Sequence, residues 1–246
     1  MKIRKRSLAG LALSLLGVLV AQTLAAQTLS APAAAPAAAA GSGVYTLVYL
    51  KTGPKSGQLS EAENKEAFIG HFSNMTRLAS ERKLLVAGPF GKERHAADLR
   101  GLFILATGDR QEAETWAGTD PTTKAGVFVL EYHRLETAAP LAAALERYFA
   151  NEEKARQEGR ELKMEETMRH YVWLLADGRE KARLALAPLF DKGQAFLTGN
   201  YDENQLLVLL DAENAEAAKA AYGEALAKLG TYSLDEWFGS LELAKP

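Results

Sequence analysis

Apolar runs and helix signals divide the first part of the chain into a regular series of elements. Residues 44–50 are rich in β-branched and aromatic side chains and predict a strand. Ser60 and Glu63 form a capping-box pattern that predicts the start of a helix reaching about Lys83. Two strands, a second helix and a last strand should follow, at residues 84–90, 102–107, 109–116 and 127–132. Asp109 and Glu112 predict the cap of the second helix.

Apolar side chains in the first predicted helix recur at helical spacing. Phe68, Phe72, Met75 and Ala79 therefore predict its buried stripe. His71 lies three residues after Phe68 and four before Met75. This spacing places the histidine at the border of the stripe.

The same order of elements begins again near His170. Asp177 and Glu180 predict the cap of a helix reaching about Lys192, and Pro188 should kink or shorten that helix. The strands of this second series are expected at residues 171–176, 195–198, 205–210 and 234–243, with an alanine-rich helix at 212–229. Residues 83–88 and 194–199 share a helix end, apolar residues and a closing glycine. We interpret the pattern as a degenerate internal duplication.

The order β-α-β-β-α-β is that of a ferredoxin-like unit. Such a sheet carries its helices on one face, so its other apolar face needs a partner. We therefore expect an α+β fold in which two tandem ferredoxin-like domains pack as a pseudo-dimeric α+β barrel. The first domain spans residues 44–136 and the second spans 170–246, with a helical linker at 137–169 whose helix covers 137–158.

The amino terminus has the pattern of a secretory signal. Residues 1–26 combine four basic side chains with a short apolar run and small residues, and cleavage is expected near Ala25 or Ala26. The alternative is an uncleaved anchor, but the run is shorter than the ~20 residues of a spanning helix. Residues 27–43 form an Ala/Pro spacer, expected to be a disordered linker. The sequence therefore predicts a periplasmic or secreted protein with no membrane contact after cleavage.

Composition narrows the chemistry. The chain has 246 residues, no cysteine and a net charge of −2. The absence of cysteine excludes disulfides, thiol catalysis and Cys-ligated metals. Loss of the signal leaves 25 basic against 31 acidic residues, so the charge of −6 does not favour nucleic-acid binding. His133 and His170 lack partners at metal-ligand spacing, and we expect neither a metal nor another cofactor.

Three stretches of residues 44–136 together resemble the YciI-like (YCII-related) family. They are His71 in the first helix, residues 83–90, and Trp116 followed by Asp120-Pro121 and residues 125–127. The resemblance implies a dimeric α+β barrel with an active His–Asp pair that matches His71 and Asp120. Relatives of this barrel include dehydrochlorinases and muconolactone isomerases, so the resemblance implies a lyase or isomerase acting on small ring compounds.

The predicted topology brings the first helix, the end of the second helix and the loop 89–100 to one edge of the sheet. There His71 would abstract a proton while Asp120 orients its ring. The remaining substrate-binding candidates lie in and before the loop: Gly88, Pro89, His95 and Arg100.

Structural interpretations of the same residues stay open. His71 fits a hydrogen-bonded histidine at the core edge, and Asp120 before Pro121 fits a helix cap. His95 fits a solvated basic loop. The second copy has Ala182 where the first has His71 and lacks an Asp-Pro, so we expect one competent site. The alternative function is a non-catalytic module that binds a small ligand. We expect an intramolecular pseudo-dimer, and the sequence leaves higher oligomers open.

We predict that the exported protein begins near Gln27, because cleavage after the small residues removes the basic and apolar segments. Amino-terminal sequencing of protein recovered from the periplasm or the medium measures this directly. Recovery of intact Met1 in a soluble cytoplasmic fraction would contradict the prediction.

Overall fold

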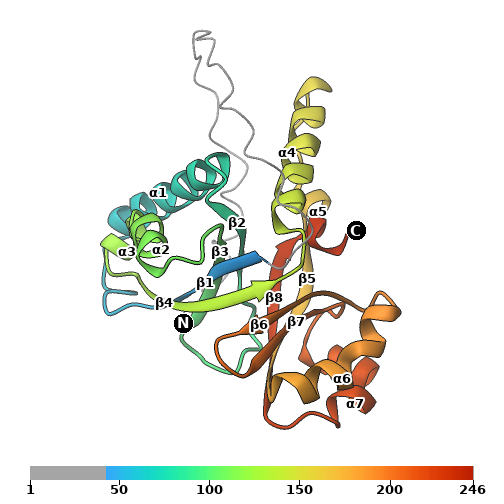
Figure 1. Cartoon of the computed structure of the whole chain (residues 1–246). Coiled ribbons are helices and arrows are strands. Elements are labelled where there is room, and N and C mark those ends of the chain that lie inside the picture. Colours follow the sequence, from blue (N-terminus) through green and yellow to red (C-terminus); the bar gives the residue numbers. More distant parts are fainter. Residues whose placement is uncertain (1–42, 246) are drawn as a thin grey trace, which may run out of the picture. The chain divides into compact units, whose positions relative to one another are not determined.

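The computed structural model describes residues 43–245, which form a mixed α/β fold around one antiparallel, nearly closed, barrel-like sheet (Figure 1). The predicted signal at 1–26 and the predicted linker up to residue 42 lie outside the described residues. Gly43, assigned to the linker from sequence, is the first residue of a strand. No helix in the described part is both long and apolar enough to span a membrane.

The first half of the described chain has the predicted order of elements with one additional short helix. Its strands are β1 (Gly43–Thr52), β2 (Leu84–Pro89), β3 (Leu99–Leu105) and β4 (Phe128–Thr137). Its helices are α1 (Glu61–Ser80), α2 (Arg110–Ala117) and α3 (Pro121–Lys124). The α1 capping box between Ser60 and Glu63 is confirmed.

Two helices, α4 (Leu141–Gln157) and α5 (Met164–Thr167), connect this half to the next. The strands of the second half are β5 (Met168–Asp177), β6 (Ala195–Tyr201), β7 (Gln205–Leu210) and β8 (Tyr232–Ser240). Its helices are α6 (Arg179–Asp191), α7 (Ala215–Leu226) and a final 3₁₀ turn, η1 (Leu241–Ala244).

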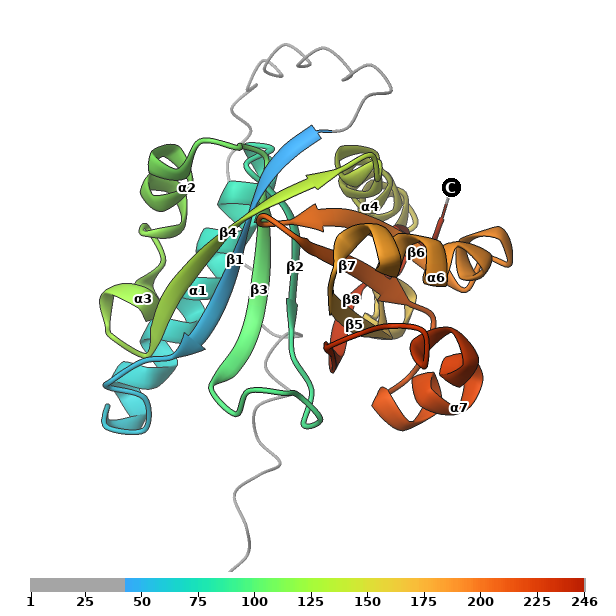
Figure 2. The ribbon, with the colours of Figure 1, turned by 60° about the horizontal axis from the view of Figure 1, so that its bottom comes forward.

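Within residues 43–245, eight strands form one sheet in the order β2-β3-β1-β4-β6-β7-β5-β8. The two halves join where three residues of β4 pair with three of β6, and we call this the β4–β6 seam. The outer strands also approach each other, because Phe90 bridges to Trp237 and the Gly91 N–H donates to the Glu236 carbonyl at 2.7 Å. The sheet is thereby nearly closed at a second seam, between the β2 end and β8 (Figure 2).

Three apolar clusters show which sheet face each helix covers. Alternate residues of one strand belong to different clusters: Leu47 and Tyr49 face the cluster shared by both halves, whereas Val48 and Leu50 pack under α1 and α2. The second half repeats this arrangement under α6 and α7. Because both faces of the sheet are buried along much of β1, β3, β5 and β7, these four strands are mostly apolar.

The buried stripe predicted for α1 is wrong by one residue. Its buried side chains are Ala67, His71, Asn74 and Leu78, whereas Phe72 is 45% exposed. The positions of the aromatic and aliphatic residues predicted which side of α1 is buried. The helix instead turns two polar side chains, His71 and Asn74, towards the sheet. His71 therefore lies within the buried face rather than at its border.

Several predicted ends in the second half also differ. The cap of α6 is Gly178, with φ of 74°, and not Asp177, which continues β5 and receives a hydrogen bond from Gln205. Pro188 does not shorten α6, because it lies in the last turn and removes only one helical hydrogen bond. Helix α7 starts after Asn214, whose side chain caps it, rather than at Ala212.

The helix between the two halves also starts later than the predicted residue 137. The linker helix α4 begins at Leu141, because β4 extends to Thr137.

Gly88 and Gly199, which end the two similar sequence stretches, each lie at a seam. A Cβ on Gly88 would lie 2.1 Å from the Phe238 carbonyl oxygen of β8, and one on Gly199 would lie 2.5 Å from a methyl group of Leu135 in β4. Gly88 therefore permits β2 to approach β8, and Gly199 permits β6 to approach β4.

We predict that residues 44–136 alone will dimerise or aggregate, whereas residues 44–246 can form a compact monomer. The isolated first half would expose the apolar face that the second half covers, at a cost of ~25 cal/mol per Å². Light scattering on the two fragments measures their masses. A stable monomer of residues 44–136 would show that this face needs no partner.

Candidate functional site

The structure brings His71 and Asp120 together, although 49 positions separate them in sequence. The His71 Nδ1 lies 2.6 Å from the Asp120 Oδ2, and both side chains are buried, with 7% and 1% of the residues exposed. Helix α1 supplies the histidine, and the aspartate is the N-cap of α3. The geometry agrees with the predicted pair, while its catalytic role stays a prediction.

Asp120 is held in place by the start of its own short helix. Its Oδ1 accepts the Thr122 backbone N–H at 2.8 Å and the Thr122 hydroxyl at 2.5 Å, leaving Oδ2 for the histidine. Burial raises the pKa of Asp120, but the hydrogen bonds from His71 and Thr122 outweigh it and leave the pKa below its ordinary value. The Asp120 carboxylate therefore has both expected roles: one oxygen caps α3, and the other contacts His71.

Aromatic rings surround the His71 imidazole. It stacks on Phe103 of β3, with ring centroids 5.9 Å apart and an angle of 21°. Phe68, Phe72 and Phe128 meet it edge to face, with centroids 5.3 to 6.1 Å away. These contacts fix the plane of the ring and make its surroundings apolar.

A close approach of α1 to α3 makes the pair geometrically possible. A Cβ on Gly70 would lie 2.8 Å from the Pro121 Cγ, so a larger residue would separate the two helices. Sequence reasoning missed Gly70 and Thr122. The available signal was a glycine inside a helix, which costs about 1 kcal/mol relative to alanine and is usually retained for packing.

His95 lies beside an acidic residue of the second half. Its Nδ1 is 2.8 Å from the Asp235 Oδ2, and its backbone N–H donates to the Asp235 Oδ1 at 2.5 Å. Asp235 is buried, while 47% of the His95 side chain is exposed. These contacts attach the β2–β3 loop to β8, whereas the prediction placed His95 in a loop near His71.

The remaining predicted binding residues have structural partners. Arg100 donates to the Thr52 hydroxyl at 2.7 Å, Gly88 packs against β8, and Pro89 is exposed at the end of β2. None of these contacts involves His71 or Asp120. Their participation in substrate binding stays a prediction.

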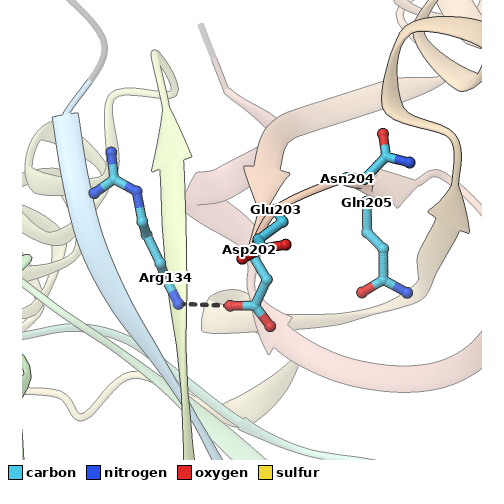
Figure 3. A pocket seen from close by; sticks show the side chains of 5 residues that line it. All are labelled: Arg134, Asp202, Glu203, Asn204 and Gln205. Atoms are coloured by element: carbon cyan, nitrogen blue, oxygen red, sulfur yellow. Dashed lines mark hydrogen bonds between the residues drawn. The ribbon is translucent and has the colours of Figure 1, made fainter.

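A pocket of about 750 Å³ lies at the turn between β6 and β7, lined by Arg134 and by residues 202–205 (Figure 3). It does not include His71. Within residues 43–245, no group of three or more His, Cys, Asp or Glu side chains is arranged to hold a metal ion.

Residues 44–136 match the family model of the YCII-related domain. This segment is a YCII-related domain. The comparisons with curated proteins and with solved structures gave no match. The YCII-related domain contains both members of the His71–Asp120 pair, together with Gly70 and Thr122 that position them.

We predict that Asp120→Asn lowers the free energy of unfolding by about 1–3 kcal/mol at pH 7, because it removes a buried charged acceptor. Since the folded-state pKa is lowered, this stabilisation is present above the unfolded pKa of about 4 and is lost as the pH falls through the folded value. Urea unfolding at pH 7 and pH 3 measures the difference between wild type and variant.

Asp109→Asn is the matched control, because Asp109 caps α2 at the surface without a histidine. Its effect should be smaller at pH 7. A loss for Asp120→Asn that is equal at both pH values would show that the ionised carboxylate is not the stabilising form.

Proposed function

We propose that the YCII-related domain is a proton-abstracting lyase or isomerase site, with His71 as general base and Asp120 as its orienting partner. The hydrogen bond of 2.6 Å between them carries the proposal. An anchored carboxylate on Nδ1 directs the other ring nitrogen, Nε2, to accept a proton. Asp120 is itself held by two hydrogen bonds from Thr122, which supports a fixed orientation of the imidazole.

The proposed reaction balances without a cofactor. The Nε2 lone pair takes a proton from an activated C–H bond, and the imidazolium that forms is stabilised by the Asp120 carboxylate. The electron pair left on carbon then shifts into a neighbouring carbonyl or double bond. In an isomerase the proton returns to another carbon, and in a lyase a leaving group departs with its electron pair.

The apolar surroundings of His71 support a small ring compound as substrate. Phe68, Phe72 and Phe128 make T-shaped contacts with the imidazole, and aromatic surfaces favour flat, apolar partners. We propose lactones or substituted aromatic rings with an acidic C–H as the substrate class.

A second candidate is a module that binds a small ligand without changing it. The exposure of Ile69 and Phe72, at 50% and 45%, favours it, because these side chains offer an apolar contact surface beside a histidine that is itself buried. Calorimetric binding of a compound that is recovered unchanged distinguishes this function from turnover.

We further propose that residues 170–246 are a degenerate copy of the first domain, so that the chain is a pseudo-dimer of ferredoxin-like units. The matching strand orders β2-β3-β1-β4 and β6-β7-β5-β8 support it, as do the paired glycines at the two seams. Ala182, the counterpart of His71, is buried in α6. One chain would then have one active site, in the exported protein that residues 1–26 suggest.

We predict that His71→Gln lowers turnover by about 10²- to 10⁴-fold, the usual contribution of a general base. Asp120→Asn should lower kcat as well, because the ring would lose its orienting acceptor. Screening of purified protein against lactones and halogenated aromatic acids, followed by NMR or chromatography of the products, provides the assay.

His170→Gln is the control, because His170 is an exposed histidine of the second half. Undiminished turnover by folded His71→Gln would remove His71 from the mechanism.

A further inference from the structure

Asp202, in the turn after β6, connects the second half to the first. Its Oδ1 accepts the Arg134 backbone N–H at 3.0 Å, and its own N–H donates to the Arg134 carbonyl at 3.0 Å. Figure 3 shows the carboxylate directed at the backbone of β4, while the Arg134 guanidinium extends away from it. The Asp202 Oδ2 lies 2.7 Å from the His133 Nδ1, so the histidine completes this contact.

The other nitrogen of His133 also faces a carboxylate. Its Nε2 lies 2.8 Å from the Glu131 Oε1, and the ring stacks on Tyr201 with centroids 4.8 Å apart. The side chain is only 17% exposed. His133 therefore lies between two acidic groups, one on its own strand and one from the other half.

The number of protons on the ring decides how many of these bonds can form. A neutral imidazole has one N–H donor and one acceptor nitrogen, whereas an imidazolium has two donors. Ionised carboxylates can only accept hydrogen bonds. A neutral His133 would therefore turn a lone pair towards either Asp202 or Glu131.

We propose that His133 makes the stability of the β4–β6 seam depend on pH. Its imidazolium form donates hydrogen bonds to both Asp202 and Glu131 and stabilises the seam, whereas its neutral form stabilises the seam less. The seam consists of only three residue pairs, at 135–137 and 199–201. The contact between His133 and Asp202 lies at the end of this short seam, beside the two hydrogen bonds between Asp202 and the Arg134 backbone.

Glu131 and Lys51, near His133, keep their charges across the range in which a histidine ordinarily titrates. Burial raises the pKa of Glu131, but hydrogen bonds from Lys51 and His133 leave it below its ordinary value. Lys51 of β1 contacts Glu131 at 3.0 Å and Asp98 at 3.2 Å, and these contacts raise its pKa.

The neighbouring tyrosines stay neutral in the same range. Burial raises the pKa of Tyr49 and Tyr201, which contact the ring from β1 and β6. Aspartates and glutamates with ordinary pKa values are ionised above about pH 5. Among the residue types of this cluster, histidine is the one that ordinarily changes charge near neutral pH.

His95 at the other seam provides a matched control. It too joins an aspartate of the second half through Nδ1, but within the described residues no hydrogen bond is made to its Nε2. A neutral ring with its proton on Nδ1 keeps every contact that His95 makes. Its contribution to stability should therefore depend less on pH.

The test is thermal unfolding of the whole protein at pH 5.5 and pH 8, followed by circular dichroism. His133→Asn should lower Tm by about 2–4 °C more at pH 5.5 than at pH 8, which corresponds to about one hydrogen bond in a chain of this size. The Tm loss caused by His95→Asn should differ less between the two pH values.

Glu131→Gln supplies an independent variant, because the amide can donate as well as accept and therefore tolerates a neutral ring. It should reduce the pH dependence that His133 gives to Tm. In the wild-type protein at pH 5.5, long-range ¹H–¹⁵N NMR should find protons on both ring nitrogens of His133.

An equal Tm loss for His133→Asn at both pH values would overturn the proposal. Should that variant fail to fold, an unchanged pH dependence in Glu131→Gln, or a singly protonated His133 ring at pH 5.5, would overturn it equally.

Discussion

The apolar cluster enclosed by both halves is the constraint on which the rest of the structure depends. Tyr49 and Ile104 of the first half meet Trp173, Leu209 and Trp237 of the second in one continuous core. A hydrogen bond from the Trp173 indole N–H to the Tyr49 hydroxyl, at 3.1 Å, crosses it. This core occupies the inner face of the sheet. The helices α1, α2, α6 and α7 therefore cover its outer face.

This arrangement decides where chemistry can be placed. The inner face is occupied by large aromatic side chains, whereas the His71–Asp120 pair lies on the outer face between α1, α3 and Phe103 of β3. The pair is thus supported by strand β3 and held between the middle of α1 and the start of α3. A site built on such elements holds its geometry better than one built on loops.

The sequence predicts local features well because their causes are local. The Ser60 cap and the Asp120-Pro121 turn follow from short patterns. The meeting of His71 with Asp120 is not local, and it was expected from the family resemblance and the order of the elements. The register of α1 was missed because an exposed Phe72 and a buried Asn74 reverse the usual preference of their residue types.

The carboxylate partners of His95 and His133 could not be predicted. Asp235 and Asp202 lie 140 and 69 positions away along the chain, and each contact depends on how the two halves close against each other. Nothing in the sequence near either histidine indicates an acidic partner at that distance.

The two seams of the sheet have a consequence that concerns symmetry. In a homodimer built on a two-fold axis, both interfaces are identical, and any substitution appears in both. Here one seam joins His95 to Asp235 and the other joins His133 to Asp202, with different neighbours. Because both seams are formed by one covalent chain, a substitution at one seam does not appear at the other. One seam can therefore acquire a dependence on pH that the other lacks.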